Sequence, residues 1–139
     1  MRIDGVENGV VIDHIPAGRG MELYRYLKLD DVTCEVALIK NVPSQKRGKK
    51  DILKINDNIE LDFDLLGYID PHITVNIVKD SVLMKKLHPG LPQTITDVIF
   101  CRNPRCITAT EQELPHVFKL TDPEKGVYRC IYCEERAKK

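Results

Sequence analysis

The chain has 139 residues, of which 42% are hydrophobic and 30% are charged, a composition typical of a soluble globular protein and unlike that of a disordered tail. Its 21 lysines and arginines balance its 21 aspartates and glutamates, which excludes a general electrostatic attraction to nucleic acids or membranes. No apolar run is long enough for a signal peptide or a transmembrane helix, so we expect a cytoplasmic protein without structural disulfides.

The first part of the chain alternates between strand and helix patterns. Strands are predicted over 6–15, 32–38, 51–56 and 73–77, and helices over 20–29 and 62–70. The first helix would place Met21, Tyr24 and Leu27 on one apolar stripe with Leu23 beside it, and Cys34 would be a small core residue on its strand. This order is the split βαβ pattern of a ferredoxin-like sheet with both helices on one face.

Proline and glycine then interrupt the pattern at Pro89, Gly90 and Pro92, which indicates a linker. We therefore predict two domains, 1–92 and 93–139. Short strands are expected in the second domain at TDVIF and VYRCIYC, which makes it a small all-β, zinc-ribbon-like domain and the whole chain an α+β protein.

Four of the five cysteines lie in the second domain as C-x4-C, a gap of 23 residues, and C-x2-C. Two close pairs can face each other across a tetrahedral metal site, and the spacing predicts one structural zinc held by Cys101, Cys106, Cys130 and Cys133. A redox couple at Cys130 and Cys133 would leave the other pair unexplained. His116 also lies between the pairs and could replace a sulfur, although we expect it at the surface.

A basic segment runs from Lys40 to Lys54 and is opposed only by Asp51. Most charge runs are solvated loops, and the sequence NVPSQKRGKK reads as one. However, Lys50 and Lys54 share one face of the predicted strand, so both could contact the same anion. The phosphate-binding loops of nucleotide hydrolases and of dinucleotide-binding proteins are absent from the sequence, so the residues alone indicate an anion site and nothing more specific.

These pieces together resemble one family. VIDHIPAG (11–18), GKKDILKI (48–55), ITVNIV (73–78), CRNPRCIT (101–108) and RCIYCE (129–134) occur in the order found in the regulatory chain of aspartate carbamoyltransferase, and the resemblance covers nearly the whole chain. It implies a non-catalytic allosteric subunit of pyrimidine biosynthesis that binds ATP or CTP. It also implies a homodimer of regulatory chains, which joins separate catalytic chains through its zinc domain, and neither nucleic acid nor membrane as a partner.

Carried over by motif, the resemblance also implies the effector-binding residues. They are Ile3, Asp4, Gly5, Val6, Asp13, His14, Lys50, Lys54, Asn76 and Lys86. One departure is Ser81, where members of the family can carry a tyrosine, so an aromatic wall of the nucleotide site is absent. Two other functions stay open on the residues alone, a zinc ribbon that binds nucleic acid through its arginines and a redox protein that uses Cys130 and Cys133.

Overall fold

The computed structural model describes residues 6–46 and 48–137. The chain divides into two compact units, Met1–Gly90 and Leu91–Lys139, called unit 1 and unit 2 below, whereas the predicted boundary is at 92. Pro92 belongs to unit 2, where its carbonyl accepts a hydrogen bond of 2.6 Å from the Tyr128 hydroxyl. None of the helices in the described part of the chain has the length and apolar character that a membrane crossing needs.

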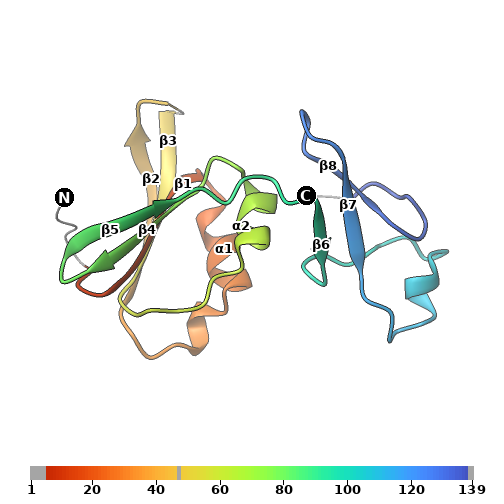
Figure 1. The fold of residues 1–139 in the computed structure, drawn as a ribbon, viewed down its shortest axis with the longest axis horizontal. Helices are drawn as coiled ribbons and strands as arrows, with labels where there is room; N and C mark the ends of the chain where they lie inside the picture. The colour runs from red at the N-terminus through yellow and green to blue at the C-terminus, as the bar shows by residue number, and fades with distance from the viewer. Residues whose placement is uncertain (1–5, 47, 138–139) are drawn as a thin grey trace. The chain divides into compact units, whose positions relative to one another are not determined.

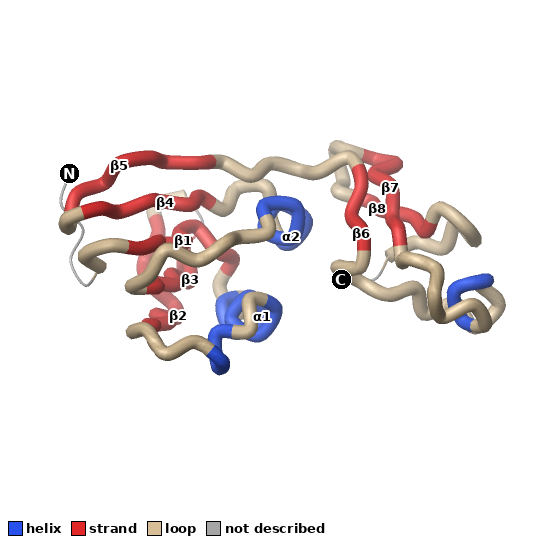
Figure 2. Tube along the Cα trace, turned by 60° about the horizontal axis from the view of Figure 1, so that its bottom comes forward, coloured by secondary structure: helices blue, strands red, loops and turns tan. Residues whose placement is uncertain are grey.

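Unit 1 is a five-stranded antiparallel sheet with the strand order β2-β3-β1-β4-β5. Both helices pack on the same face of this sheet (Figures 1 and 2). The first four strands with the two helices form the predicted βαββαβ arrangement, and the α+β fold class is confirmed. The elements are β1 (Gly9–Pro16), α1 (Gly20–Tyr26), β2 (Val36–Ser44), β3 (Gly48–Ile55), α2 (Phe63–Ile69), β4 (Thr74–Lys79) and β5 (Val82–Leu87).

The core of unit 1 lies between the sheet and the helices. Strand residues whose side chains alternate toward the helices are fully enclosed, among them Ile12, Leu53 and Val75, each 0% exposed. Leu23 of α1 and Leu66 of α2 are also 0% exposed. Helix α2 begins where the Asp62 side chain accepts a hydrogen bond of 3.1 Å from the Leu65 amide, which is the usual N-cap.

Several predicted elements of unit 1 differ from the structure. The strand expected over 32–38 is β2, Val36–Ser44, and Cys34 lies half-buried in a bend before it. The predicted loop 41–50 is largely strand, because Pro43 lies on an edge strand, where its missing N–H is tolerated. Helix α1 ends at Tyr26 instead of residue 29, and Met21 is 40% exposed, so the buried stripe contains Leu23 and not Met21.

Strand β5 was not predicted. It follows β4 through a two-residue turn at Asp80 and Ser81, whose φ angles are both positive, as a type I′ hairpin requires. Neither turn residue is glycine, the residue that usually marks such a turn in a sequence. The strand is also an exposed edge with two adjacent lysines, so its alternation is weak.

Unit 2 is a three-stranded antiparallel sheet with the order β6-β7-β8. The strands are β6 (Thr94–Thr96), β7 (Val117–Asp122) and β8 (Val127–Cys130). The predicted strand TDVIF is wrong, since β6 ends at Thr96, and VYRCIYC is a strand only as far as Cys130. The small core contains Ile95, Phe118 and Tyr128, each at most 2% exposed, and a 3-10 turn at Ile107–Ala109 follows Cys106.

Candidate functional site

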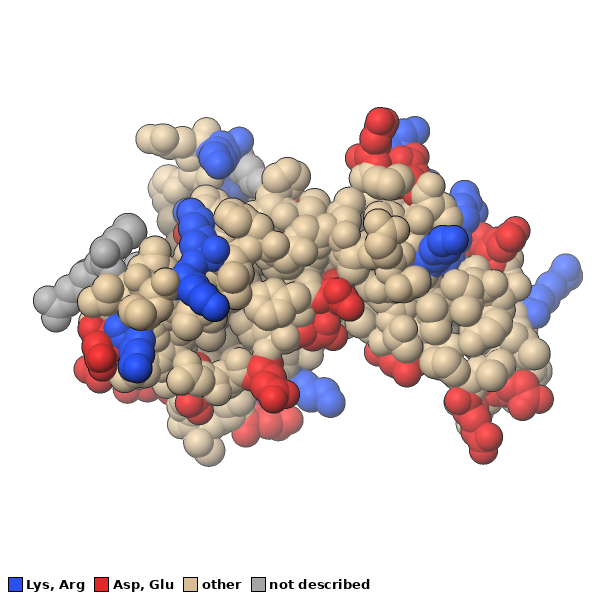
Figure 3. Space-filling model, viewed as in Figure 1, with Lys and Arg blue, Asp and Glu red and all other residues tan. Residues whose placement is uncertain are grey.

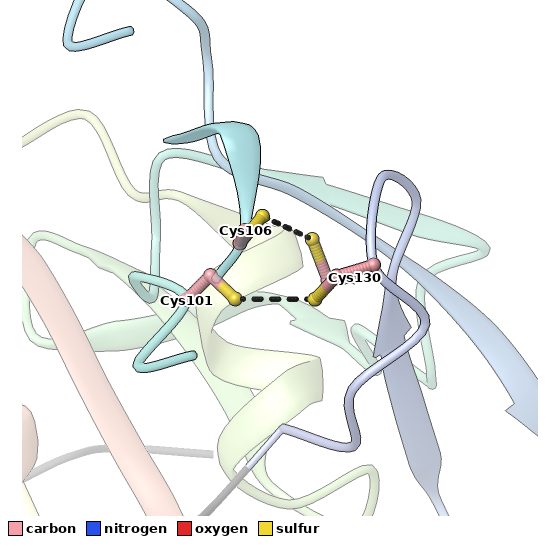
Figure 4. A group of neighbouring side chains, drawn as sticks. Cys101, Cys106 and Cys130 are labelled. Carbon is pink, nitrogen blue, oxygen red and sulfur yellow. Dashed lines mark hydrogen bonds between the residues drawn. The ribbon is translucent and has the colours of Figure 1, made fainter. Parts of the chain in front are cut away.

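Four cysteine sulfurs converge on one point in unit 2. The Sγ atoms of Cys101, Cys106, Cys130 and Cys133 all lie within 4.8 Å of one another. Cys101 is 3.6 Å from Cys133, and Cys106 is 3.7 Å from Cys130 (Figure 4). The structure therefore brings together all four cysteines that the spacing singled out, and each short contact joins one sulfur of the first pair to one of the second.

Tight turns hold each pair in place. In the first, the Cys106 amide donates to the Asn103 carbonyl at 3.0 Å, and the Ala109 amide donates to the Cys106 carbonyl at 2.9 Å. In the second, the Glu134 amide donates to the Cys130 carbonyl at 2.9 Å just after β8 ends. Because the sheet carries Cys130 and the loop before the 3-10 turn carries Cys101 and Cys106, the two turns face each other.

The sulfur distances fit a metal site better than any sulfur–sulfur bond. All five cysteines are free, and the observed separations far exceed the disulfide bond length of about 2.05 Å. A tetrahedron with metal–sulfur bonds of about 2.3 Å has sulfur–sulfur edges of about 3.8 Å. The two short contacts are close to that value, so the four thiolates can hold one tetrahedral ion such as zinc or iron.

The cysteines differ in how readily they lose their protons. Burial raises the pKa of Cys101 to about 12, although a hydrogen bond from the Asn103 backbone acts against it. Burial also acts to raise the pKa of Cys106, but hydrogen bonds from the Thr108 hydroxyl and backbone outweigh it and lower that pKa to about 7. Burial raises the pKa of Cys130. A metal that binds here at neutral pH must therefore displace protons from Cys101 and Cys130.

His116 is not the surface residue that we expected. Its ring is half-buried, and Nδ1 accepts a hydrogen bond of 3.1 Å from the Cys101 amide, while the ring stacks edge-on with Phe100. The histidine thus supports the backbone of a candidate ligand and does not replace a sulfur. Sequence spacing could not reveal this, because the contact joins a side chain to a main-chain group across the loop.

Three residues predicted for the effector site, Lys54, Asn76 and Lys86, lie on the sheet face away from the helices, called the outer face below. Lys54 of β3 pairs with Val11 of β1, Val11 with Asn76 of β4, and Asn76 with Lys86 of β5. Directly paired residues point to the same face, so these four residues form one row across four strands. Figure 3 shows lysine and arginine side chains over the strands of this unit and at the end of the β2–β3 hairpin.

A β-bulge places Asp13 and His14 next to this row. Both residues lie opposite Ile52 of β3, because the register shifts between Ile12 and Ile15, and His14 adopts a φ of 58°. Lys50 Nζ lies 3.0 Å from Asp13 Oδ1. Burial lowers the pKa of His14, and the nearby ammonium groups of Lys50, Lys86 and Lys46 lower it further against the opposing effect of Asp13. His14 is therefore close to three cations, a suitable arrangement for a polyanion.

An apolar floor completes the outer face, and the residues alone did not identify it. Val6, Val11 and Val78 are at most 6% exposed and pack together, with Ile52 against them. Of these residues only Val6 was predicted at the site; Ile3, Asp4 and Gly5 lie outside the described residues. In sequence, these valines cannot be distinguished from ordinary core residues.

Asp51 is a buried carboxylate directly behind this face. It was expected to oppose the basic segment, but its side chain is 0% exposed and lies on the core side of β3, next to Ile15. Its oxygens accept hydrogen bonds from the amides of Gly18 at 3.1 Å, Gly20 at 2.9 Å and Asn41 at 3.0 Å. Asp51 therefore joins the β1–α1 turn and the bulge in β2 to the strand that carries Lys50 and Lys54.

Comparisons with known proteins assign both units. A family model described as the allosteric domain of the aspartate carbamoyltransferase regulatory chain matches residues 1–89, and one for its metal binding domain matches 93–139. A regulatory chain from Clostridium tetani is 52% identical over 136 residues, covering 97% of this chain and 94% of the relative. One from Clostridium botulinum is 47% identical (97% and 92%), and one from Bifidobacterium longum is 41% identical (99% and 99%).

The family models and these three relatives agree over nearly the full length of both chains, and the expected resemblance is confirmed. The relatives are named regulatory chains, which are not the catalytic subunits of the enzyme. The described four-cysteine cluster also lies within the part that matches a metal binding domain. This chain belongs to the family of aspartate carbamoyltransferase regulatory chains.

Proposed function

We propose that this chain is a nucleotide-sensing, non-catalytic subunit of aspartate carbamoyltransferase that controls pyrimidine biosynthesis in the cytoplasm. Its outer face binds a nucleoside triphosphate, ATP or CTP, and the four cysteines hold one structural zinc. Unit 2 attaches to catalytic chains, and unit 1 pairs with a second regulatory chain. The boundary between these roles falls at the linker near residue 92.

The observation that carries the nucleotide site is the row of Lys54, Val11, Asn76 and Lys86 beside the Asp13–His14 bulge. Lys50 is on the same face of β3 as Lys54, so three lysines lie on or beside this row. Each charge-assisted hydrogen bond to a phosphate contributes about 1.5–3 kcal/mol, so several of them favour a triphosphate over a monophosphate. Asp13 and Asn76 offer acceptors and a donor for the ribose or the base.

Zinc is the metal that the donor set favours, because four thiolates fill the tetrahedron and leave no position for a reactive water. Such a closed site supports structure and not catalysis. Large apolar side chains are exposed beside the cysteines, among them Phe100 at 65% and Ile131 at 48%. An exposed apolar patch next to a rigid metal site supports the attachment of unit 2 to another protein.

Regulation then requires that each nucleotide bind the two states of the assembly with different affinities. Coupling free energies between sites are typically about 1–3 kcal/mol. Contacts with the base and the ribose differ between ATP and CTP, while the phosphate contacts are shared. The outer face can therefore bind both nucleotides at one site and still distinguish their effects.

Removal of single lysines tests the nucleotide site. We expect Lys54→Ala and Lys86→Ala each to weaken ATP and CTP binding about 10-fold or more, since each loses a charged contact with phosphate. Lys85→Ala is the matched control, because Lys85 is the neighbour of Lys86 on β5 but pairs with Ile77 and lies on the opposite face. Isothermal titration calorimetry on the full chain measures the affinities. If all three variants bind the nucleotides as tightly as the parent, the outer face is not the nucleotide site.

The competing function is a zinc ribbon that binds nucleic acid. It would require tight, salt-dependent binding of duplex or single strands, with a loss of affinity when Arg102 or Arg105 is replaced. Free ATP and CTP would then not compete. Saturable binding of the free nucleotides to the parent chain, without such binding of strands, favours the regulatory function.

A further inference from the structure

Thr108 contacts one of the four sulfurs directly. Its hydroxyl lies 3.1 Å from Cys106 Sγ, within hydrogen-bond range for sulfur. Thr108 is 5% exposed, so its hydroxyl is largely shielded from water. A buried hydroxyl needs a partner, and here the partner is a candidate metal ligand.

The backbone fixes this contact. Thr108 lies in the middle of the 3-10 turn Ile107–Ala109, which Cys106 precedes. The Ala109 amide donates to the Cys106 carbonyl at 2.9 Å, and the Thr110 amide donates to the Ile107 carbonyl at 3.2 Å. The turn therefore holds the Thr108 hydroxyl beside the sulfur, and a β-branched side chain has few other rotamers available.

The contact has a clear direction once a metal is bound. A thiolate has no proton, so it can only accept, and the hydroxyl must donate. Four thiolates around a divalent cation carry a formal charge of minus two in a largely buried site. A hydroxyl dipole aimed at one sulfur disperses part of that charge and fixes the orientation of the ligand.

We propose that Thr108 is a positioning residue of the metal centre, whose hydroxyl holds the Cys106 thiolate on the ion and slows release of the metal. The proposal rests on the proposed function, because it requires that the four cysteines hold a metal. It goes beyond that function by assigning part of the stability of the centre to a residue that is not a ligand.

Three variants of the full chain test this role. Thr108→Val removes the hydroxyl and keeps the shape, whereas Thr108→Ser keeps the hydroxyl. Thr110→Val is the matched control, because the Thr110 hydroxyl belongs to the same turn but donates to the Ile107 carbonyl at 3.1 Å instead of to a sulfur. Each protein is loaded with zinc, and the rate of zinc release to an excess of a chromophoric chelator is measured.

We expect zinc release from Thr108→Val to be about 10-fold faster than from the parent, the lower end of the usual effect of losing such a partner. Release from Thr108→Ser and Thr110→Val should stay close to the parental rate. Replacement of zinc by cobalt gives a second readout, since the sulfur-to-cobalt charge-transfer band reports on the thiolates themselves. That band should move to lower energy in Thr108→Val alone, because a sulfur without the hydrogen bond is a stronger electron donor.

Unchanged release and an unchanged cobalt band in Thr108→Val would overturn the proposal. Faster release with an unchanged band, or an equal acceleration in Thr108→Ser, would also overturn it, because the effect would then be one of packing. A parent chain that binds neither zinc nor cobalt would refute the metal centre itself. Failure of this inference can therefore be distinguished from failure of the proposed function.

Discussion

Replacement of Cys106 by serine is expected to abolish tight metal binding and to unfold unit 2. Cys106 is 2% exposed, and its sulfur lies 3.7 Å from that of Cys130, so no other side chain can take its place without rearrangement. Structural zinc contributes an apparent folding free energy of about 10–16 kcal/mol at neutral pH. The short sheet of unit 2 has a small core, which cannot compensate for such a loss.

Hydrogen exchange measured by mass spectrometry would separate the effects on the two units. In Cys106→Ser, amides of β7 and β8 should lose protection while those of β1 and β3 keep it, and nucleotide binding should persist while association with catalytic chains is lost. Cys34→Ser is the control, because Cys34 is half-buried in unit 1 and lies outside the cluster. Retained association in Cys106→Ser would contradict the division of roles between the units.

Asp51→Ala is expected to destabilise unit 1 by about 3 kcal/mol or more. The substitution leaves the amides of Gly18, Gly20 and Asn41 without their carboxylate acceptor, and a buried unsatisfied donor typically costs about 1–3 kcal/mol. Gly20 also approaches closely, since a Cβ atom there would lie 2.8 Å from Asp51 Oδ2. The carboxylate and the glycine therefore fit each other, and water has little space to replace the lost oxygens.

Urea unfolding, followed through exchange of β1 and β3 amides, would measure this effect. The midpoint for unit 1 should fall strongly in Asp51→Ala and less in Asp51→Asn, which keeps one acceptor oxygen. Asp57→Ala should leave the midpoint unchanged, because Asp57 is exposed and its carboxylate accepts a hydrogen bond from the amide of its chain neighbour Asn58. A midpoint for Asp51→Ala equal to that of the parent would show that the three hydrogen bonds contribute nothing net.

The four-cysteine cluster could be predicted from the sequence, because the spacing within each cysteine pair is a local feature of the chain. Each cysteine pair forms its own tight turn, and the spacing within a pair already limits where the two sulfurs can lie. The convergence of Cys101 and Cys106 with Cys130 and Cys133 needed only that the turns face each other. By contrast, His116 and Thr108 act through contacts that depend on loop conformation, and no pattern in the sequence marks them.

The alternation of apolar and polar residues predicts most strands of the unit 1 sheet, because this alternation is strong where one face of a strand is buried. Thus the sequence pattern identifies β1, β3 and β4, and the face predicted for the 73–77 strand is buried at Ile73 and Val75. The bounds of β2 were wrong and β5 was missed, since both are edge strands with exposed faces. Edge strands have weak periodicity, and their limits are set by pairing with the neighbour.

The arrangement of residues on the outer face could be anticipated only in part. Lys50 and Lys54 share a strand face, which period-two geometry gives directly. The positions of Asp13 and His14 depend on a bulge, and the alignment of Asn76 with Lys86 depends on the register of the unpredicted strand β5. Side chains alternate along β3, so Asp51 must point to the face opposite Lys50 and therefore into the core. Because Asp51 is charged and lies among lysines in the sequence, it was expected to be an exposed partner of those lysines.

The metal content of the purified, untagged full chain tests this account most directly. If unit 2 folds only because its four cysteine sulfurs bind one metal ion, plasma mass spectrometry should find one zinc per chain. A strong chelator should then remove the zinc, and the amides of β7 and β8 should lose their protection from hydrogen exchange at the same time. A metal-free chain in which the amides of unit 2 remain fully protected from hydrogen exchange would contradict the account.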